Sequence, residues 1–563
     1  SMYEGQNVFA RTDILVWMGE SVVIICFVYA ISVFAGIVTG NMMMHFAMAG
    51  LLNFVVPGLL MLFSVYFQQF VFGFRLSESF YSMCADMTPY LKVMEDGGSY
   101  SALSILAYLA VTVIVLVISS LLYGKRKLER TGDSLVFAFM QPVICYIIAF
   151  AGMSLMGFYF TSFSSNSNYS VSYLYLGFAA GALLFFMIGQ MIVKKTPRIF
   201  NKKGLRDFGI FAVIACLFLL CINIDVLGYE KKIPPVETVA SVSIPNSFPE
   251  GVSNLGVGGN DSGLVELKDP KNIEAFIRFH RSVIENRQQF FKSGNAYYDY
   301  KTAWVPLEYQ LKNQKTVSRE YNGVSQTFVA ESSDLKEIFT SKEYKEAVGI
   351  KSKGFGKILT MSLHTVGSLK WEEQEARTIH TNDMAAFIDC IDADFKAQTY
   401  EEMRSMKRPY IGLELVHSYH SEANSPLQTD SIDVSIPKSY RKTIAWLQSK
   451  GYDVGLRVTA ADVSSIQLYK TEDGVQFYED GSMQTNVGIP SGELKDREAA
   501  GQKAVVITDK GQIQEILDTC KTNSTHGKSY YYGRIIGTDQ NIQDDSCYYD
   551  FEDAPNFVTK LFK

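Results

Sequence analysis

The sequence has few cysteines, and they follow no pattern typical of a disulfide framework or a zinc site. None of its eight cysteines belongs to a Cys-x-x-Cys pair. Four lie inside long apolar runs, where cysteine acts as a small apolar residue, and the other four are widely spaced. This distribution excludes a disulfide-rich scaffold and a cysteine-ligated zinc site.

Motifs for catalysis are also lacking. The nearest match to a Walker A motif is Gly527-Lys-Ser529, but Thr522 stands where the first glycine should be. The pair His417 and His420 falls in an alternating pattern typical of a strand, so the two side chains should point to opposite faces. The sequence therefore predicts no catalytic, metal or cofactor site.

A net charge of −6 also argues against nucleic-acid binding.

Charge is scarce in the first part of the chain. Residues 1–230 hold 13 of the 52 basic and 12 of the 58 acidic residues, although they make up about two fifths of the sequence. A membrane-spanning helix needs roughly 20 mainly apolar residues, and six stretches meet this requirement. They are Ile14–Ile37, Phe46–Phe74, Ser101–Leu122, Leu135–Phe160, Tyr173–Val193 and Phe208–Leu227.

Basic residues in the short loops predict the orientation of the spans. Clusters of Lys and Arg lie at 124–130 and 194–206, whereas the loop at 75–100 is acidic and the loop at 161–172 is uncharged. Because cytoplasmic loops carry the excess of Lys and Arg, the two basic loops should face the cytoplasm. The sixth span then ends outside, and the remainder of the chain is expected outside the cell.

The same parity predicts that the first span begins outside. Residues 1–13 contain no apolar segment of a signal peptide, and the sequence opens with Ser1. We therefore expect an N-terminally truncated fragment that lacks an odd number of upstream spans. The alternative is that Ser1-Met2 were added in cloning and the first span inserts unaided.

Few polar residues interrupt the spans. Glu20 is the most unusual, because a carboxylate at mid-membrane costs about 2.5–3.5 kcal/mol on insertion scales. It is a candidate for the translocation path, unless it lies near the outer interface or bonds to a neighbouring helix. Asn53, Gln141 and Gln190 are expected to join helices to one another through hydrogen bonds.

The overall pattern predicts an α-helical membrane domain over 1–228, a linker over 229–236, and an extracytoplasmic α+β domain over 237–563. In the last part, alternation at 305–311 and 317–321 predicts a β-hairpin. The segment 435–451 predicts a helix with Ser435 or its neighbour as the cap, Pro437 in the first turn and Gly451 at the end.

A weak internal repeat of strand, polar turn and helix is visible three times in the C-terminal part. The strands and turns are 265–269, 378–382 and 505–509. Asp269 and Asp509 occupy equivalent positions, and His380 takes this place in the middle copy. We interpret the aspartates as turn or cap residues rather than catalytic ones.

Three segments resemble a known family. These are Tyr123-Gly-Lys-Arg-Lys-Leu-Glu-Arg-Thr-Gly-Asp133 with Phe137 and Pro142, the segment 33–40 at the end of the first span, and the segment 307–321. Together they are similar to ABC-2-type, multidrug-like ABC transporter permeases of Firmicutes that carry a C-terminal extracytoplasmic domain of unknown function. Gln314 departs from the glycine that such a hairpin would be expected to contain.

The resemblance implies a permease subunit of an exporter in the plasma membrane, with a separate cytoplasmic ATPase. A second permease chain, identical or different, would complete the path. The ATPase would dock on a cytoplasmic segment, for which the candidates are Lys125, Arg126, Lys127, Glu129, Arg130 and Asp133. The same basic loop could instead only hold the topology, and the main contact could lie upstream.

Two other functions remain open at this point. The chain could be a membrane-anchored sensor whose outer domain binds a ligand, although the sequence contains no recognisable cytoplasmic signalling domain. It could also be a membrane-embedded enzyme that acts on lipid or cell-wall precursors. That function would need converging carboxylates or histidines near the outer face, and Asp225 with Glu230 is too weak a pattern to indicate such a site.

Overall fold

The structure is a computed structural model of the full chain. It describes residues 11–94, 100–126, 133–161, 171–196, 202–226, 228–245, 264–291, 302–351, 358–366, 377–405, 407–420, 427–477, 483–485, 505–521, 529–538, 543–549 and 554–562. The chain divides into two compact units. The membrane unit comprises 1–232 and 291–296, and the C-terminal domain comprises 233–290 and 297–563.

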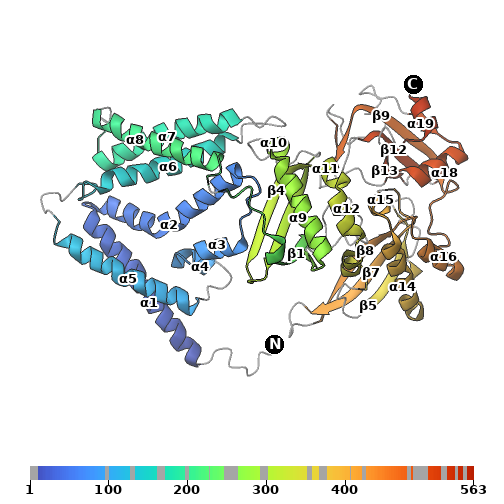
Figure 1. The fold of residues 1–563 in the computed structure, drawn as a ribbon, viewed down its shortest axis with the longest axis horizontal. Helices are drawn as coiled ribbons and strands as arrows, with labels where there is room; N and C mark the ends of the chain where they lie inside the picture. The colour runs from blue at the N-terminus through green and yellow to red at the C-terminus, as the bar shows by residue number, and fades with distance from the viewer. Residues whose placement is uncertain are drawn as a thin grey trace. The chain divides into compact units, whose positions relative to one another are not determined.

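The membrane unit contains six helices that are long and apolar enough to cross a bilayer, within the described residues. They confirm the six predicted spans, and two short helices connect the second to the third (Figure 1). The long helices are α1 (Arg11–Val38), α2 (Met42–Phe70), α5 (Ala102–Tyr123), α6 (Met140–Thr161), α7 (Val171–Lys194) and α8 (Lys202–Asn223); the short ones are α3 (Glu78–Ala85) and α4 (Pro89–Met94).

Three spans differ from the sequence prediction by about four to six residues at one or both ends. The second span starts at Met42, capped by the Asn41 side chain, and its helix ends at Phe70 rather than Phe74, because the backbone of Val71 is extended. The fourth starts at Met140 rather than Leu135, because Leu135 forms a β-bridge with Thr39. The sixth starts earlier, at Lys202. Hydropathy locates apolar segments, but it does not show at which residue the hydrogen bonds of a helix begin or end.

Glycines allow α6 and α7 to approach closely. A Cβ added at Gly181 would lie 2.6 Å from the carbonyl oxygen of Gly152, and one added at Gly177 would lie 2.6 Å from that of Met156. The ring of Phe178 fills the space beside Gly157. Close backbone approach through small residues is a common way to pack helices in a membrane.

The C-terminal domain consists of three modules with one topology. Each has a first strand, a second strand before a helix, and two further strands after it, and in each antiparallel sheet these four lie in the spatial order second, first, third, fourth. The sheet of the third module has a fifth strand, Met483–Thr485, which also pairs with the first strand of that module. Figure 1 shows the three sheets of the C-terminal domain. The repeat expected from the sequence is thus confirmed and extends to whole modules.

The first module contains β1 (Val239–Pro245), β2 (Leu264–Leu267), α9 (Pro270–Glu285), α10 (Arg287–Phe290), β3 (Thr302–Leu311) and β4 (Thr316–Ser325). A turn of 3-10 helix, Val236–Thr238, precedes it. Three helices follow it, namely α11 (Gln326–Glu331), α12 (Ser333–Thr340) and α13 (Lys342–Val348).

The second module contains β5 (Ile358–His364), β6 (Arg377–Thr378), α14 (Thr381–Ala397), α15 (Tyr400–Met403), β7 (Ile411–His420), β8 (Leu427–Ile436) and α16 (Arg441–Lys450). The third contains β9 (Val463–Phe477), β10 (Met483–Thr485), β11 (Val505–Ile507), α18 (Lys510–Thr519), β12 (Ser529–Gly537), β13 (Gln543–Tyr549) and α19 (Asn556–Leu561).

The aspartates of the repeat are helix caps, as predicted. The Asp269 carboxylate accepts a hydrogen bond from Lys271 N at 3.0 Å, and the Asp509 carboxylate accepts one from Gln512 N at 2.9 Å. His380 occupies the same place before α14, but its side chain makes no such bond. These side chains satisfy amides that the first turn of a helix leaves unpaired.

The predicted helix over 435–451 starts later than expected. Ser435 belongs to β8, where it pairs with Gly412, and α16 begins only at Arg441, so neither the Ser435 cap nor Pro437 in the first turn is correct. The Asp394 carboxylate, from α14, accepts hydrogen bonds from Lys442 N and Thr443 N instead. The end was predicted correctly, since Gly451 adopts a φ of 71°.

Candidate functional site

Arg126 joins the end of α5 to the end of α1. Its Nη1 donates to Gly36 O at 3.1 Å and its Nη2 donates to Thr39 O at 3.3 Å. The last carbonyls of a helix have no partner within the helix and carry the negative end of its dipole. The guanidinium therefore satisfies and neutralises the C-terminal end of α1.

The segment after the basic loop makes a second set of such bonds. Val136 N donates to Val38 O at 2.9 Å, beside the β-bridge of Leu135 with Thr39. The Ser134 hydroxyl donates to Ile192 O, in the last turn of α7, at 2.9 Å. Leu135 and Val136 are both buried. We call Arg126, Ser134, Leu135 and Val136 the junction.

The junction links four spans at one end of the membrane unit. It contacts the ends of α1 and α7, and the chain itself joins it to α5 and α6. A force on this loop would therefore reach several spans at once. Sequence reasoning missed Ser134, Leu135 and Val136, because it assigned Leu135 to the fourth span.

The other predicted docking residues differ in their position. Lys125 and Asp133 flank the junction and are exposed, so both are accessible to a partner. Lys127, Glu129 and Arg130 lie outside the described residues.

Glu20 lies on α1 close to the start of α5. Its side chain is half-buried. The pKa of Tyr100, two residues before α5, is raised first by burial and then by the negative charge of Glu20. Glu20 does not line the cavity that lies between α1, α2 and α5.

A cavity of about 490 Å³ lies between α1, α2 and α5. The loop between α3 and α4 contributes Asp86 and Met87 to its wall. The wall is mainly apolar and includes Phe27, Pro57 and Tyr108. The Tyr108 hydroxyl donates to Asp86 O at 2.9 Å, which holds this loop against α5. Cavities of 300–1,000 Å³ are the size of typical small-molecule sites.

Asn53 is a polar group in this apolar wall. Its side chain is 8% exposed, and its Nδ2 donates to Ala49 O of the same helix at 2.7 Å. Its Oδ1 is buried and has no donor among the residues that the structure describes. The expected bond to another helix is therefore not seen. An unsatisfied buried acceptor costs about 1–3 kcal/mol.

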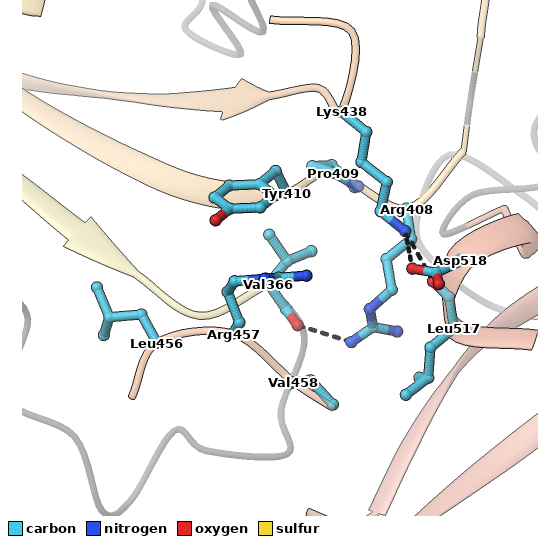
Figure 2. Close-up of a pocket in the computed structure, with 10 residues that line it drawn as sticks. All are labelled: Val366, Arg408, Pro409, Tyr410, Lys438, Leu456, Arg457, Val458, Leu517 and Asp518. Atoms are coloured by element: carbon cyan, nitrogen blue, oxygen red, sulfur yellow. Dashed lines mark hydrogen bonds and ion pairs between the residues drawn. The ribbon is translucent and has the colours of Figure 1, made fainter. Parts of the chain in front are cut away.

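The C-terminal domain has a small basic pocket of about 30 Å³ between its second and third modules (Figure 2). Lys438 Nζ donates to Leu517 O at 3.1 Å and to the Asp518 carboxylate at 2.9 Å. Burial acts to raise the pKa of Asp518, but hydrogen bonds from Lys438 and Gln514 outweigh it and hold the pKa below its usual value.

Arg408 and Arg457 complete this pocket. The Arg408 side chain is 5% exposed and donates to Val366 O at 2.7 Å, while its backbone N donates to Cys520 O at 2.8 Å. The Arg457 guanidinium lies 4.8 Å from the centre of the Tyr410 ring. A volume of 30 Å³ is about that of one water molecule. We therefore interpret the pocket as a contact between the second and third modules. In this contact the positive charge of Lys438 lies at the C-terminal end of α18.

His417 lies on β7, in agreement with the strand expected there. Among the described residues, no three His, Cys, Asp or Glu side chains are grouped closely enough to hold a metal ion.

Comparison with known proteins adds no relative: no family model, curated protein or solved structure matches this chain. The class of protein rests on the fold alone. Six long apolar helices followed by sheets and helices define a multi-pass membrane protein with an α+β domain.

Proposed function

We propose that this chain is the membrane-spanning subunit of an ABC exporter, driven by a separate cytoplasmic ATPase. A second permease chain would complete the path. The proposal rests on the sequence resemblance together with one structural observation, the junction that ties the basic loop to the ends of α1 and α7. A partner that binds this loop has a direct mechanical connection to the spans.

The proposal includes an orientation. With the basic loops at 124–130 and 194–206 in the cytoplasm, the C-terminal domain lies outside the cell. Protease added to intact cells should then degrade the C-terminal domain and spare the loop at 124–130. Protection of the domain in intact cells, with cleavage after lysis, would reverse the orientation.

The central experiment is purification of the full-length protein from its native membrane in mild detergent, followed by mass spectrometry. An ATPase with a Walker A motif should copurify in a stoichiometric amount. Its absence after chemical crosslinking in the membrane would contradict the transporter proposal, and a receptor function would then be favoured.

Charge reversal tests the docking loop. Lys125→Glu should reduce the amount of copurified ATPase severalfold, because it reverses an exposed charge beside the junction. Lys203→Glu is the matched control, since it reverses an exposed charge in the other basic loop. Equal effects of the two changes would mean that the charges only maintain topology. The protease assay above shows whether either variant has changed its orientation.

A further inference from the structure

The long helices of the membrane unit form two groups. In the first group α1 packs along α5, and Phe27 and Ile31 of α1 form a small core with Tyr108 of α5. In the second group α6, α7 and α8 pack on one another. Among the described residues, neither α1 nor α5 packs along any helix of the second group. α2 lies between the two groups (Figure 1). We call residues 42–56 and 58–70 the N-terminal part and the C-terminal part of α2.

The N-terminal part of α2 is held by the first group and by the junction. His45 Nε2 lies 3.2 Å from the Ser32 hydroxyl of α1, and the His45 ring lies beside Gly36. The β-bridge of Thr39 with Leu135 shortly precedes this part of α2. The junction also connects the first group to the end of α7. The two groups are therefore fixed to each other at this end of the membrane unit.

The C-terminal part of α2 is held by the second group. The Tyr66 hydroxyl lies 3.0 Å from Ser154 Oγ of α6, and the centres of the Tyr66 and Phe218 rings, from α2 and α8, are 5.2 Å apart. Just beyond α2, Phe72 N donates a hydrogen bond at 2.9 Å to the carboxylate of Glu230, which follows α8. At the end away from the junction, α2 is thus attached to the second group.

The short helix α4 follows the first group. The centre of its Tyr90 ring lies 5.8 Å from that of Phe54, in the N-terminal part of α2. The Tyr108 hydroxyl of α5 donates to Asp86 O, just before α4. The described residues 71–77, which lead from α2 to α3, form neither a helix nor a strand. They can therefore change conformation while the end of α2 stays on the second group.

Pro57 lies where α2 passes from the first group to the second. Proline has no N–H, so the helical hydrogen bond to Asn53 O cannot form. Asn53, Val56 and Pro57 line the cavity between α1, α2 and α5. A Cβ added at Gly58 would have no described neighbour within 4 Å. α2 therefore lacks a backbone bond and close packing at the point where sharp bends in helices usually occur.

We propose that Pro57 is a hinge between two rigid bodies. The first body is α1, α5 and the N-terminal part of α2, and the second is α6, α7, α8 and the C-terminal part of α2. The bodies pivot at the junction, and their far ends separate as α2 bends. The bend breaks no backbone bond, because proline has already removed the one at this turn. This inference goes beyond the proposed function, since the movement requires neither an ATPase nor a substrate.

The test measures distances between pairs of spin labels by pulsed electron paramagnetic resonance, on the full-length protein in lipid nanodiscs. The labels are attached to a keto amino acid, which leaves all the cysteines in place. The first pair replaces Ala102 and Ile224, at the far ends of α5 and α8, and the second replaces Tyr123 and Lys203, at the ends near the junction. All four positions are exposed. An excess of unlabelled protein removes distances between copies of the chain.

We expect a broad or two-peaked distance distribution for the far pair and a single narrow one for the pair near the junction. Pro57→Ala restores the backbone donor, so it should narrow the distribution of the far pair to the width of the other. Val65→Ala is the matched control, because it truncates a half-exposed side chain of the same helix and leaves the backbone bonds unchanged. It should leave both distributions as they are.

A broad distribution for the far pair that narrows only in Pro57→Ala supports the proposal. Equally narrow distributions for both pairs in the wild type overturn it. Equally broad ones overturn the junction as the fixed end, and a far pair that stays broad in Pro57→Ala overturns the role of Pro57. The two pairs are compared in the wild-type background, so the existence of the movement is decided without the Pro57 variant.

Discussion

His280 is buried in the first module between two tyrosines. Its Nδ1 lies 2.7 Å from the Tyr309 hydroxyl, and its Nε2 lies 2.6 Å from the Tyr321 hydroxyl. A neutral imidazole has one donor and one acceptor, so it can satisfy both hydroxyls without a charge. Burial, and to a smaller extent the charge of Arg319, lower the pKa of His280 to about 3.

This pKa predicts how acid affects stability. Because the unfolded pKa is about 6.5, the unfolded chain binds a proton between pH 6.5 and 3 that the folded domain excludes. The stability from neutral His280 is complete above pH 6.5 and falls by about 1.4 kcal/mol per pH unit below it. Urea titration with pulse proteolysis, read on C-terminal fragments, should detect this slope.

His280→Phe provides the control for this titration. The variant should be about 2–4 kcal/mol less stable at pH 7, because two buried hydroxyls lose their partner. It should also lose the part of the acid slope that His280 contributes. An unchanged slope in the variant would assign the acid sensitivity to other groups.

Gln314 occupies a backbone conformation that favours glycine. It is the third residue of the loop between β3 and β4 and has a φ of 65°. Gln314 N donates to Leu311 O, and Leu311 N donates to Lys315 O, both at 2.9 Å. A three-residue hairpin loop with its last residue in the left-handed region commonly has glycine there.

Gln314→Gly should therefore stabilise the C-terminal domain by about 0.5–1 kcal/mol, since only glycine adopts this φ without steric cost. Lys315→Gly is the matched control. It adds the same flexibility to the unfolded chain at a position without a positive φ, and it should destabilise. Thermal unfolding of both variants tests this, and a lower midpoint for Gln314→Gly would contradict the steric argument.

At the scale of helices, α6 and α7 depend on the absence of side chains at their contact. The Cβ of an alanine at Gly181 would meet backbone atoms at 2.6 Å, so the helices would have to separate. At Gly189, the nearest atom to an added Cβ is 3.4 Å away, an ordinary contact distance.

Gly181→Ala should accordingly destabilise the membrane unit by about 1–3 kcal/mol through overpacking. Gly189→Ala makes the same chemical change in the same helix and should have little effect. The temperature at which the detergent-solubilised protein aggregates would distinguish them. Equal shifts for the two variants would show that helix separation at Gly181 is not the cause.

The ends of helices in the C-terminal domain depend on residues from other elements. Asp394 of α14 caps α16, and Lys345 Nζ, from α13, donates to the carbonyl oxygens of Lys396 and Gln398 at the end of α14. Lys345 is largely buried, and this burial lowers its pKa. Such caps leave no local pattern, which explains why the start of α16 was predicted wrongly.

At the scale of the whole molecule, contacts join neighbouring modules of the C-terminal domain. The Tyr400 hydroxyl and the Arg404 guanidinium both donate to Ala330 O, between the first and second modules. Arg408 and Lys438 bind the end of α18, between the second and third (Figure 2). The modules therefore share helix ends that no single module could satisfy.

Lys438→Met should weaken the contact between the second and third modules by about 0.5–1.5 kcal/mol, because it removes the partly exposed hydrogen bonds from Lys438 Nζ to Leu517 O and to the Asp518 carboxylate. Methionine retains much of the apolar stem. Arg441→Met, at an exposed position at the start of α16, is the control. Hydrogen exchange of the α18 amides in the full-length protein should increase only in the first variant. Equal exchange in both would mean that Lys438 does not stabilise the contact.

Much of the fold could be predicted from the sequence because it follows from neighbouring residues. Hydropathy located the six spans, alternation located the hairpin of β3 and β4, and Asp269 and Asp509 marked the starts of two helices. Of the candidate site, the sequence identified Arg126 from its position in a basic loop. It did not identify Ser134 or Val136, whose partners are 58 and 98 residues away.

The sequence by itself determined six apolar stretches long enough to span a membrane, followed by an α+β part with a weak repeat of strand, turn and helix. Apolar length and periodicity are properties of short segments, so they are the same before and after folding. Only the tertiary structure determined that Arg126 binds the end of α1, that Asp394 caps α16, and that Asn53 lies in the wall of a cavity. These features depend on how distant segments pack, and packing brings together residues whose separation along the chain carries no local signal.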